Sequence, residues 1–117
     1  MKIIEKSRDN MNVSDLHNLT RSINAHKMET AKGTRLNIDD YVFFIDEKTD
    51  AKSGEVIETL VLSIRDDGEI YSTISPTFID EFKAIREICR ECGEAFDHVD
   101  VVTGTSRNGR TFITAAF

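Results

Sequence analysis

Two cysteines followed by a histidine are the residues whose types and spacing come nearest to a metal or redox site. Cys89 and Cys92 are separated by two residues, and His98 follows them closely. A redox pair of this spacing gains its thiolate at a helix N-terminus, whereas this pair falls at the end of a predicted helix, where the dipole disfavours negative charge. Zinc requires four ligands, and the sequence offers no second pair. We therefore predict core thiols, no metal and no cofactor, with a small zinc-dependent or sensor fold as the weaker alternative.

A phosphate-binding loop and a catalytic centre are the other chemical sites to consider. Residues 104–111 read GTSRNGRT, one substitution away from the pattern G-x-x-x-x-G-K-[ST]. That pattern binds phosphate only where the loop leads into a helix, and the residues that follow are strand-like, so we reject it. The three histidines, His17, His26 and His98, are isolated, and no serine or cysteine lies in a nucleophile turn. The sequence therefore predicts that the protein is not an enzyme.

One amphipathic helix is the clearest element that positions the remaining residues. Residues 75–93 read SPTFIDEFKAIREICRECG. Apolar side chains recur on one face at steps of three and four residues, which is typical of a half-buried helix: Phe78, Ile79, Phe82, Ile85, Ile88, Cys89 and Cys92. Ser75 or Thr77 is suited to cap its first amides, Pro76 to occupy its first turn, and Gly93 to end it in a left-handed conformation.

Five strand-like runs surround this helix. They cover residues 41–45, 56–65, 70–75, 98–104 and 111–117. The first run, YVFFI, is apolar on both faces, the others alternate, and the dipeptide Asn108-Gly109 predicts a tight hairpin between the last two. Three strands, a helix and two strands is the order of the OB-fold, a Greek-key barrel. We predict a mainly β protein with one central helix and a five-stranded OB-fold-like barrel over residues 36–117; an α+β sheet packed on one helix gives the same order.

The N-terminal third, residues 1–35, is predicted as an extension of this domain. Ile3 and Ile4 suggest an edge strand or a tail, and a short helix is expected from Ser14 to about Ala25 because Leu16, Leu19 and Ile23 share one face. Residues 26–35 read as a linker. The extension either adds a strand, forms a dimer contact or supplies a second phosphate-binding arm, and the sequence does not choose among these roles.

Composition sets the class of protein and the distribution of charge. The chain has 117 residues, enough for one domain, and a formal charge of −6. It begins without the apolar core of a signal peptide and has no run near the roughly 20 apolar residues of a membrane span, so we expect a cytoplasmic protein with no membrane partner. Residues 1–35 carry a charge of +3 and residues 36–117 a charge of −9, yet residues 101–117 contain two arginines and no acidic side chain.

The chain resembles the small OB-fold single-stranded DNA-binding proteins that bacteriophages encode. The segments that carry the resemblance are ETLVLSI (58–64), GEIYSTISPTFIDEF (68–82) and VVTGTSRNGRTFITAAF (101–117). The resemblance covers about residues 36–117. It implies sequence-tolerant binding of single-stranded DNA in phage replication or recombination, no catalysis, a homodimer or higher assembly, and contacts with replication or recombination proteins. No acidic tail follows Phe117, so we do not expect partners to be recruited through a tail.

Binding of this kind needs aromatic faces for the bases and cations along the phosphates. The candidate rings are Tyr41, Phe43, Tyr71 and Phe112, and the candidate cations are Lys48, Lys52, Arg65, Arg107 and Arg110. Tyr71 is the preferred ring because alternation assigns Ile70 and Ile74 to the inward face. For Phe43 and Phe112 a place in the core is the favoured alternative, because phenylalanine is more often buried. Arg107 and Arg110 flank a hairpin tip that has no carboxylates nearby.

A second functional class is consistent with the acidic charge of residues 36–117. A small protein-binding module, such as a phage inhibitor that imitates nucleic acid, would gather its carboxylates on one surface. A DNA-binding protein must instead keep one surface clear of them. The position of the carboxylates in the folded protein therefore distinguishes the two functions.

Overall fold

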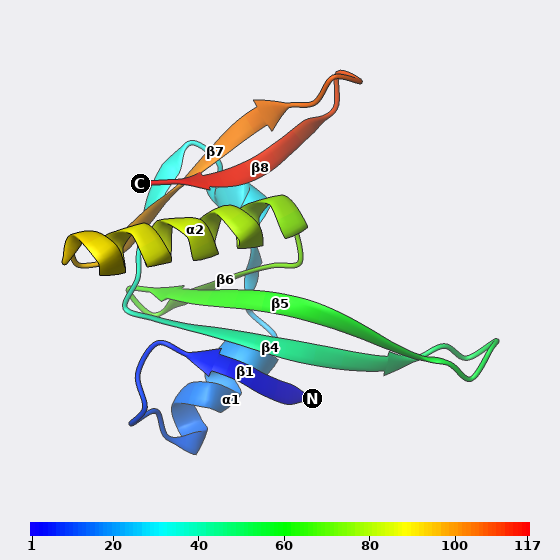
Figure 1. Ribbon diagram of the computed structural model, residues 1–117. Coiled ribbons are helices and arrows are strands. Elements are labelled where there is room, and N and C mark those ends of the chain that lie inside the picture. The colour runs from blue at the N-terminus through cyan, green and yellow to red at the C-terminus, as the bar shows by residue number, and fades with distance from the viewer.

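The computed structural model describes residues 1–117 as two β-sheets, two α-helices and one short 3-10 helix (Figure 1). The larger sheet has the order β1-β4-β5-β6-β2, formed by β1 (Lys2–Lys6), β4 (Asp40–Thr49), β5 (Val56–Asp66), β6 (Glu69–Thr73) and β2 (His26–Lys27). The smaller sheet has the order β3-β7-β8, formed by β3 (Thr34–Asn37), β7 (His98–Thr105) and β8 (Thr111–Ala116). The helices are α1 (Val13–Arg21), η1 (Met28–Ala31) and α2 (Pro76–Cys92).

One bent stretch of chain joins the two sheets. β3 pairs with β7 in the smaller sheet, and β4 pairs with β5 in the larger one. Only two residues, Ile38 and Asp39, separate β3 from β4. The mainly β class and the predicted order of three strands, helix and two strands are therefore confirmed. The predicted barrel does not close: β6 pairs with the two-residue strand β2, and β8 is an edge strand. The segment predicted as a linker thus occupies the edge of β6 that closure would require.

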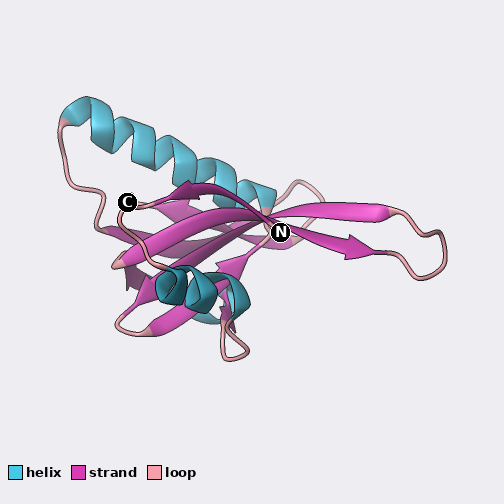
Figure 2. Ribbon diagram, turned by 90° about the horizontal axis from the view of Figure 1, so that it is seen from below, coloured by secondary structure: helices cyan, strands magenta, loops and turns pink.

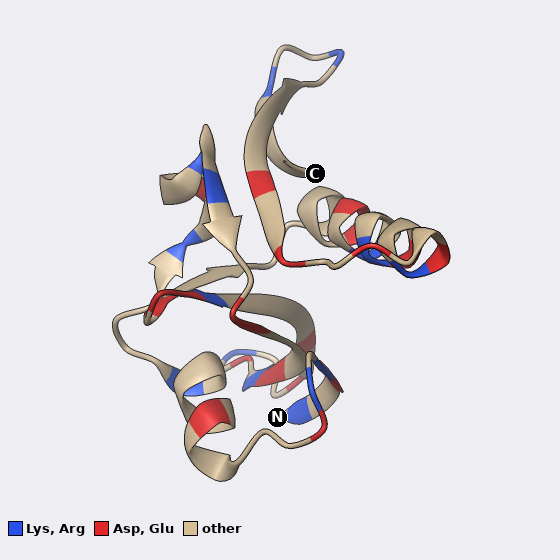
Figure 3. Cartoon of the chain, turned by 90° about the vertical axis from the view of Figure 1, so that its left-hand side faces the viewer, with Lys and Arg blue, Asp and Glu red and all other residues tan.

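The main core lies between the two sheets. α2 runs along one side of the space between them, and η1 and β3 lie on the other side (Figures 1 and 3). Phe78 and Phe82 of α2 are fully buried in this core, and the ring of Phe82 meets that of Tyr41 edge to face at 5.2 Å. The predicted limits of the helix are confirmed, because the Ser75 side chain accepts a hydrogen bond from the amide of Phe78 and Gly93 is left-handed at φ 68°.

A second, smaller core lies under α1. Leu19 of α1 packs with Val42 and Phe44 of β4 on the face of the larger sheet that points away from the main core. β4 is therefore buried on both faces, as its YVFFI run predicts. α1 begins at Val13 rather than Ser14 because Asn12 caps it in a reciprocal capping box with Asp15. Neither α-helix is long and apolar enough to span a membrane.

Two hairpins project from the same end of the molecule. The first, which we call the β4–β5 arm, comprises residues 46–59 and extends beyond the body in two perpendicular views (Figures 1 and 2). The second, the β7–β8 arm, comprises residues 103–112 and diverges from the first (Figure 1).

A buried carboxylate connects the N-terminal segment to the larger sheet. Asp40, at the start of β4, is 3% exposed and accepts hydrogen bonds from Ser7 Oγ at 3.0 Å and Arg8 Nε at 2.9 Å. The guanidinium of Arg65 in β5 forms a further ion pair with Asp40. Arg8 also bonds Asp15 of α1 at 2.9 Å. One network therefore joins the chain after β1, α1, β4 and β5.

Removal of this carboxylate is expected to destabilise the protein. The substitution Asp40→Ala leaves Arg8 and Arg65 without their shared partner, at a cost of about 2–4 kcal/mol, less than for a fully buried charge because both arginines are partly exposed. Urea unfolding measures the loss. Asp100→Ala, which removes the exposed pair between Asp100 and Arg35, is the control and should change stability little. Equal midpoints for the two variants would contradict the role of Asp40.

Candidate nucleic-acid interface

The tip of the β7–β8 arm presents two unpaired cations. Ser106 and Arg110 close the turn through a backbone hydrogen bond of 2.8 Å, and Gly109 takes the positive φ of 78° that the predicted Asn-Gly hairpin requires. Arg107 and Arg110 are exposed, and no carboxylate lies within ion-pair distance of either. Both guanidinium groups are therefore available to an anion from solution.

This arm is also free of acidic side chains. No aspartate or glutamate occurs in residues 101–117. The nearest acid along β7, Asp100, is paired with Arg35 at 2.7 Å, and this hydrogen bond lowers the pKa of the Asp100 carboxyl. The tip of the arm carries basic residues and the first acidic position below it is on the body of β7 (Figure 3). One surface is thus kept clear of carboxylates, as a DNA-binding protein needs and an acidic mimic does not.

Phe112 supplies a partly exposed ring on the same arm. Its neighbour Ile113 points into the main core, so Phe112 points to the outer face of the smaller sheet. The ring lies across Gly104, the residue directly opposite it in the hairpin. A Cβ on Gly104 would lie 2.6 Å from Cζ of the ring, which is closer than any real contact. Because Gly104 has no side chain, the Phe112 ring can lie directly over it.

The β4–β5 arm has a mixed charge. Lys48 and Lys52 are exposed and have no carboxylate within ion-pair distance. The same arm carries Glu47 and Glu58, which face each other across the strands. In its turn, Asp50 accepts hydrogen bonds from the amide of Lys52 and the hydroxyl of Ser53, which lower the pKa of its carboxyl. This arm offers two further cations at its outer half, but its acidic residues outnumber them and give it a net negative charge.

Two of the predicted stacking residues lie inside the core. Phe43 is 1% exposed and packs edge to face between Tyr41 and Phe82, with ring centroids 5.8 and 5.7 Å away. Tyr41 is 8% exposed, and its hydroxyl donates to Glu5 at 2.7 Å. Bases have no access to either ring face. The sequence alone did not decide that both rings are buried, because the run YVFFI is apolar on both faces. In the structure each face of β4 packs against a core.

Arg65, predicted as a phosphate contact, is engaged within the protein. Its guanidinium pairs with Asp40 and lies 3.8 Å from Asp15, and the side chain is 22% exposed. Its positive charge is therefore compensated by two carboxylates. The role visible in the structure is to hold α1 and β4 against β5, so we leave Arg65 out of the candidate interface.

Tyr71 lies half-buried in β6, beside the short edge strand β2. The predicted alternation places Ile70 inward, and Ile70 is buried, but in the smaller core under α1. Tyr71 points to the opposite face and packs against the main core, with its ring 5.1 Å from that of His26. Ile74 is 62% exposed rather than inward. Alternation along β6 did not predict how exposed Tyr71 is, because both faces of this sheet pack against a core.

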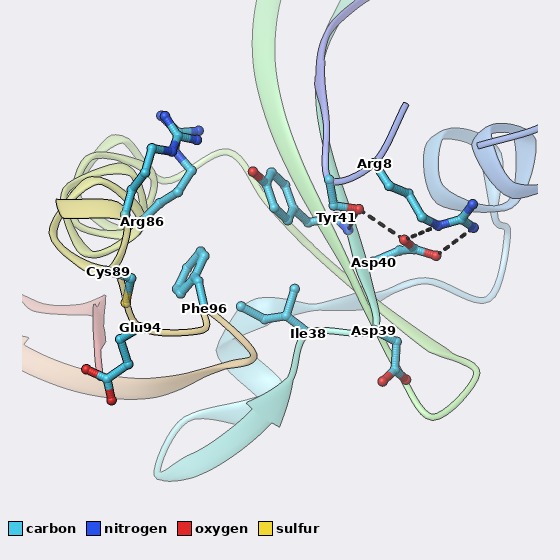
Figure 4. Close-up of a pocket in the computed structure, with 11 residues that line it drawn as sticks. Arg8, Ile38, Asp39, Asp40, Tyr41, Arg86, Cys89, Glu94 and Phe96 are labelled. Carbon is cyan, nitrogen blue, oxygen red and sulfur yellow. Dashed lines mark hydrogen bonds and ion pairs between the residues drawn. The ribbon is translucent and has the colours of Figure 1, made fainter. Parts of the chain in front are cut away.

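The surface pocket between α2 and β4 holds charges that are already paired. It encloses about 410 Å³ and brings together Arg8, Asp40, Tyr41 and Arg86 with the thiol of Cys89 (Figure 4). Arg8 is bonded to Asp40, and Arg86 forms an ion pair with Glu5. Burial raises the pKa of the Cys89 thiol, which disfavours a reactive thiolate. The pocket therefore presents neither a free cation nor an activated nucleophile.

The two cysteines differ in their surroundings. Cys89 is buried, as the prediction of core thiols requires, whereas Cys92 is exposed in the last turn of α2 and corrects that prediction for one of the pair. The helix ends at Cys92, so its final turn extends past the edge of the core. No group of three or more potential metal-ligating side chains occurs in the structure.

Comparison with known proteins identifies a family over most of the chain. A family model described as "Phage Single-stranded DNA-binding protein" matches residues 11–117. The resemblance predicted from the sequence is thereby confirmed, and the match extends it through α1, β2 and η1. No curated protein and no solved structure matches the chain.

The buried position of Tyr41 predicts that its phenol loses its proton at a higher pH than an exposed tyrosine. Burial, reinforced by the hydrogen bond to Glu5, raises the pKa of Tyr41 to about 12. Because the raised pKa favours the neutral phenol in the folded state, this contribution to stability is present below about pH 10 and is lost as the pH rises toward 12. Tyrosinate absorbance should show a component with this midpoint that Tyr41→Phe abolishes. A titration complete near pH 10 in the folded protein would contradict the assignment.

Proposed function

The chain belongs to the family of phage single-stranded DNA-binding proteins, and from this premise we propose that it binds single-stranded DNA chiefly through its β7–β8 arm. The observation that carries the proposal is the carboxylate-free arm with two unpaired arginines at its tip and one partly exposed ring behind them. In a protein with a net charge of −6, such an arm is a local positive surface.

The arm supports binding that tolerates sequence. Arg107 and Arg110 are placed to contact phosphate oxygens, for which the planar guanidinium is well suited. Phe112 offers a face on which a base of any type can stack, because every base has a π face. None of these contacts reads the edge of a base. Binding without strong sequence preference and without catalysis is therefore the expected behaviour.

The β4–β5 arm is a second contact in this proposal. Both arms leave the same end of the molecule (Figure 1), and the β4–β5 arm adds two exposed cations without a carboxylate partner, Lys48 and Lys52. The β7–β8 arm has no carboxylate, so we expect phosphates to follow it more closely than the β4–β5 arm. Tyr71, half-exposed beside His26, is a further ring that a longer strand can reach.

The family and the strand order support a wider proposal about fold and role. If β3 and β4 are counted as one bent strand, the sheet orders match an OB-fold that is open between β6 and β8. In this proposal residues 36–117 form the OB-fold-like domain, and residues 1–35 are an extension packed onto it. We propose that the protein coats single strands during phage replication or recombination in the host cytoplasm. The free edge of β1 is available for assembly into a homo-oligomer and for contacts with replication or recombination proteins.

The first test is the salt dependence of binding to labelled oligo(dT) of about 30 bases, long enough for several contacts, with duplex as competitor. Fluorescence polarisation should show binding to the single strand that weakens with salt. Arg107→Ala/Arg110→Ala should lower the affinity about tenfold or more and reduce the log–log salt slope by about 1.4, or about 0.7 for each phosphate that the variant no longer neutralises.

The matched control for this test is Arg21→Ala/Arg90→Ala. It removes the same charge from two exposed arginines that are paired with carboxylates away from the β7–β8 arm. If both double variants show the same affinity and slope, the arm is not the binding surface. If the wild-type protein does not bind at low salt, the proposed function itself fails.

A second prediction concerns the position of the ring. Gly104→Ala introduces a Cβ that displaces the Phe112 ring, so it should weaken binding nearly as much as Phe112→Ala, by about 1–2 kcal/mol for the loss of stacking with one base. The salt slope should stay unchanged because no cation is removed. Thr103→Ala, at an exposed neighbouring position, is the control. Wild-type affinity for Gly104→Ala, with unaltered unfolding in urea, would show that the ring does not bind bases.

A further inference from the structure

The outer face of the larger sheet is only half covered by α1. The helix covers the part that contains Val42, Phe44 and Ile70. Toward the β4–β5 arm, the same face continues without a covering element, and there Ile57 is 53% exposed and Ile74 is 62% exposed. Exposed aliphatic side chains that recur on one face of a sheet often mark a binding surface.

A groove runs along this uncovered half. It encloses about 590 Å³ and is lined by Val61, Ser72, Thr73 and Ile74 of the sheet together with Lys27 and Glu29. Val61 lies opposite Phe44 in the register of β4 and β5, and continuing the register of β5 and β6 by one residue places Ile74 beside Val61. Val61 and Ile74 therefore lie side by side in the groove, and Ile57 lies on the same face beyond Thr59. We call these three residues the aliphatic strip.

Two unpaired cations lie at the ends of this strip. Lys48 lies opposite Ile57 in the register of β4 and β5, and Lys27 lies opposite Ser72 in the register of β2 and β6. Both side chains therefore belong to the same face of the sheet. Neither has a carboxylate within ion-pair distance. Strand geometry separates them by roughly 20–25 Å, a span that a few extended nucleotides bridge. Of the acids on this face, Asp46 is held by Arg21 at 3.7 Å, and Glu29 is the one carboxylate lining the groove.

We propose that the aliphatic strip is a second base-binding surface, on which bases of the bound single strand pack against Val61 and Ile74 while Lys27 and Lys48 contact the adjacent phosphates. This proposal rests on the proposed function and adds a surface to it. A second copy of this chain suits the strip less well, because it would have to bury two cations that have no partner. The hydroxyl of Ser72 is engaged with Ser63 at 2.7 Å, so the surface contacts base faces and does not read base edges.

A pair of matched isoleucine substitutions tests the proposal. Ile74→Ser removes one aliphatic side chain of the strip, which is 62% exposed. Ile88→Ser removes an isoleucine of nearly equal exposure, 61%, on the outer face of α2. We expect Ile74→Ser to weaken binding to oligo(dT) about 3- to 10-fold, as weaker apolar packing against a base implies, with an unchanged salt slope. Ile88→Ser should bind like the wild-type protein. If the wild type binds and the two variants do not differ, the strip is excluded and the proposed function stands.

Two further measurements separate a DNA contact from a protein contact. In spectra of isoleucine-methyl-labelled protein, oligo(dT) should shift the signals of Ile57 and Ile74 and leave those of Ile23 and Ile88 in place; the reverse would overturn the proposal. Sedimentation without DNA should give the same mass for the wild type and Ile74→Ser. A loss of self-association in Ile74→Ser would assign the strip to contacts between copies and overturn the proposal.

Discussion

The carboxylate of Asp40 is the constraint on which the arrangement of this protein depends. Asp40 begins β4 immediately after the bend between the two sheets, and beside it the amide of Asp39 donates to the carbonyl of Arg65 at 3.0 Å. The ion pairs of Asp40 with Arg8 and Arg65 hold the N-terminal segment, α1 and β5 to this bend. Because β4 continues into one arm and β3 pairs with the strand that forms the other, the bend also sets how the two arms diverge.

The arginines of the body are paired with carboxylates, whereas the two arginines of the proposed binding surface are not. Arg8, Arg65 and Arg86 are held by carboxylates within the body, where they stabilise contacts between elements. Arg107 and Arg110 lie at the end of a hairpin without acidic neighbours. The net charge of −6 therefore does not describe what an approaching strand encounters. In the proposed function, the local distribution of charge guides a polyanion to the carboxylate-free β7–β8 arm.

Local sequence signals predicted α2 and the five longer strands around it, whereas β2, η1 and β3 fall in or begin in the predicted linker and properties set by tertiary contacts were not predictable. The periodicity and caps of α2 and the Asn-Gly turn of the β7–β8 arm depend on neighbouring residues and were confirmed. The buried rings of Tyr41 and Phe43 and the open barrel depend on which elements cover each face and edge. β2 has only two residues and no recognisable pattern, yet it occupies the edge of β6.

The position of the aromatic residues explains why charge should dominate binding. The chain has seven phenylalanines and two tyrosines and no tryptophan, and four of the phenylalanines, together with Tyr41, are buried in the two cores. Few rings remain for stacking, so in the proposed function we expect most of the affinity to come from phosphate contacts and apolar packing. Such contacts do not distinguish one base from another. A core rich in aromatic residues and a surface poor in them are thus consistent with a protein that follows the backbone of a strand more than its sequence.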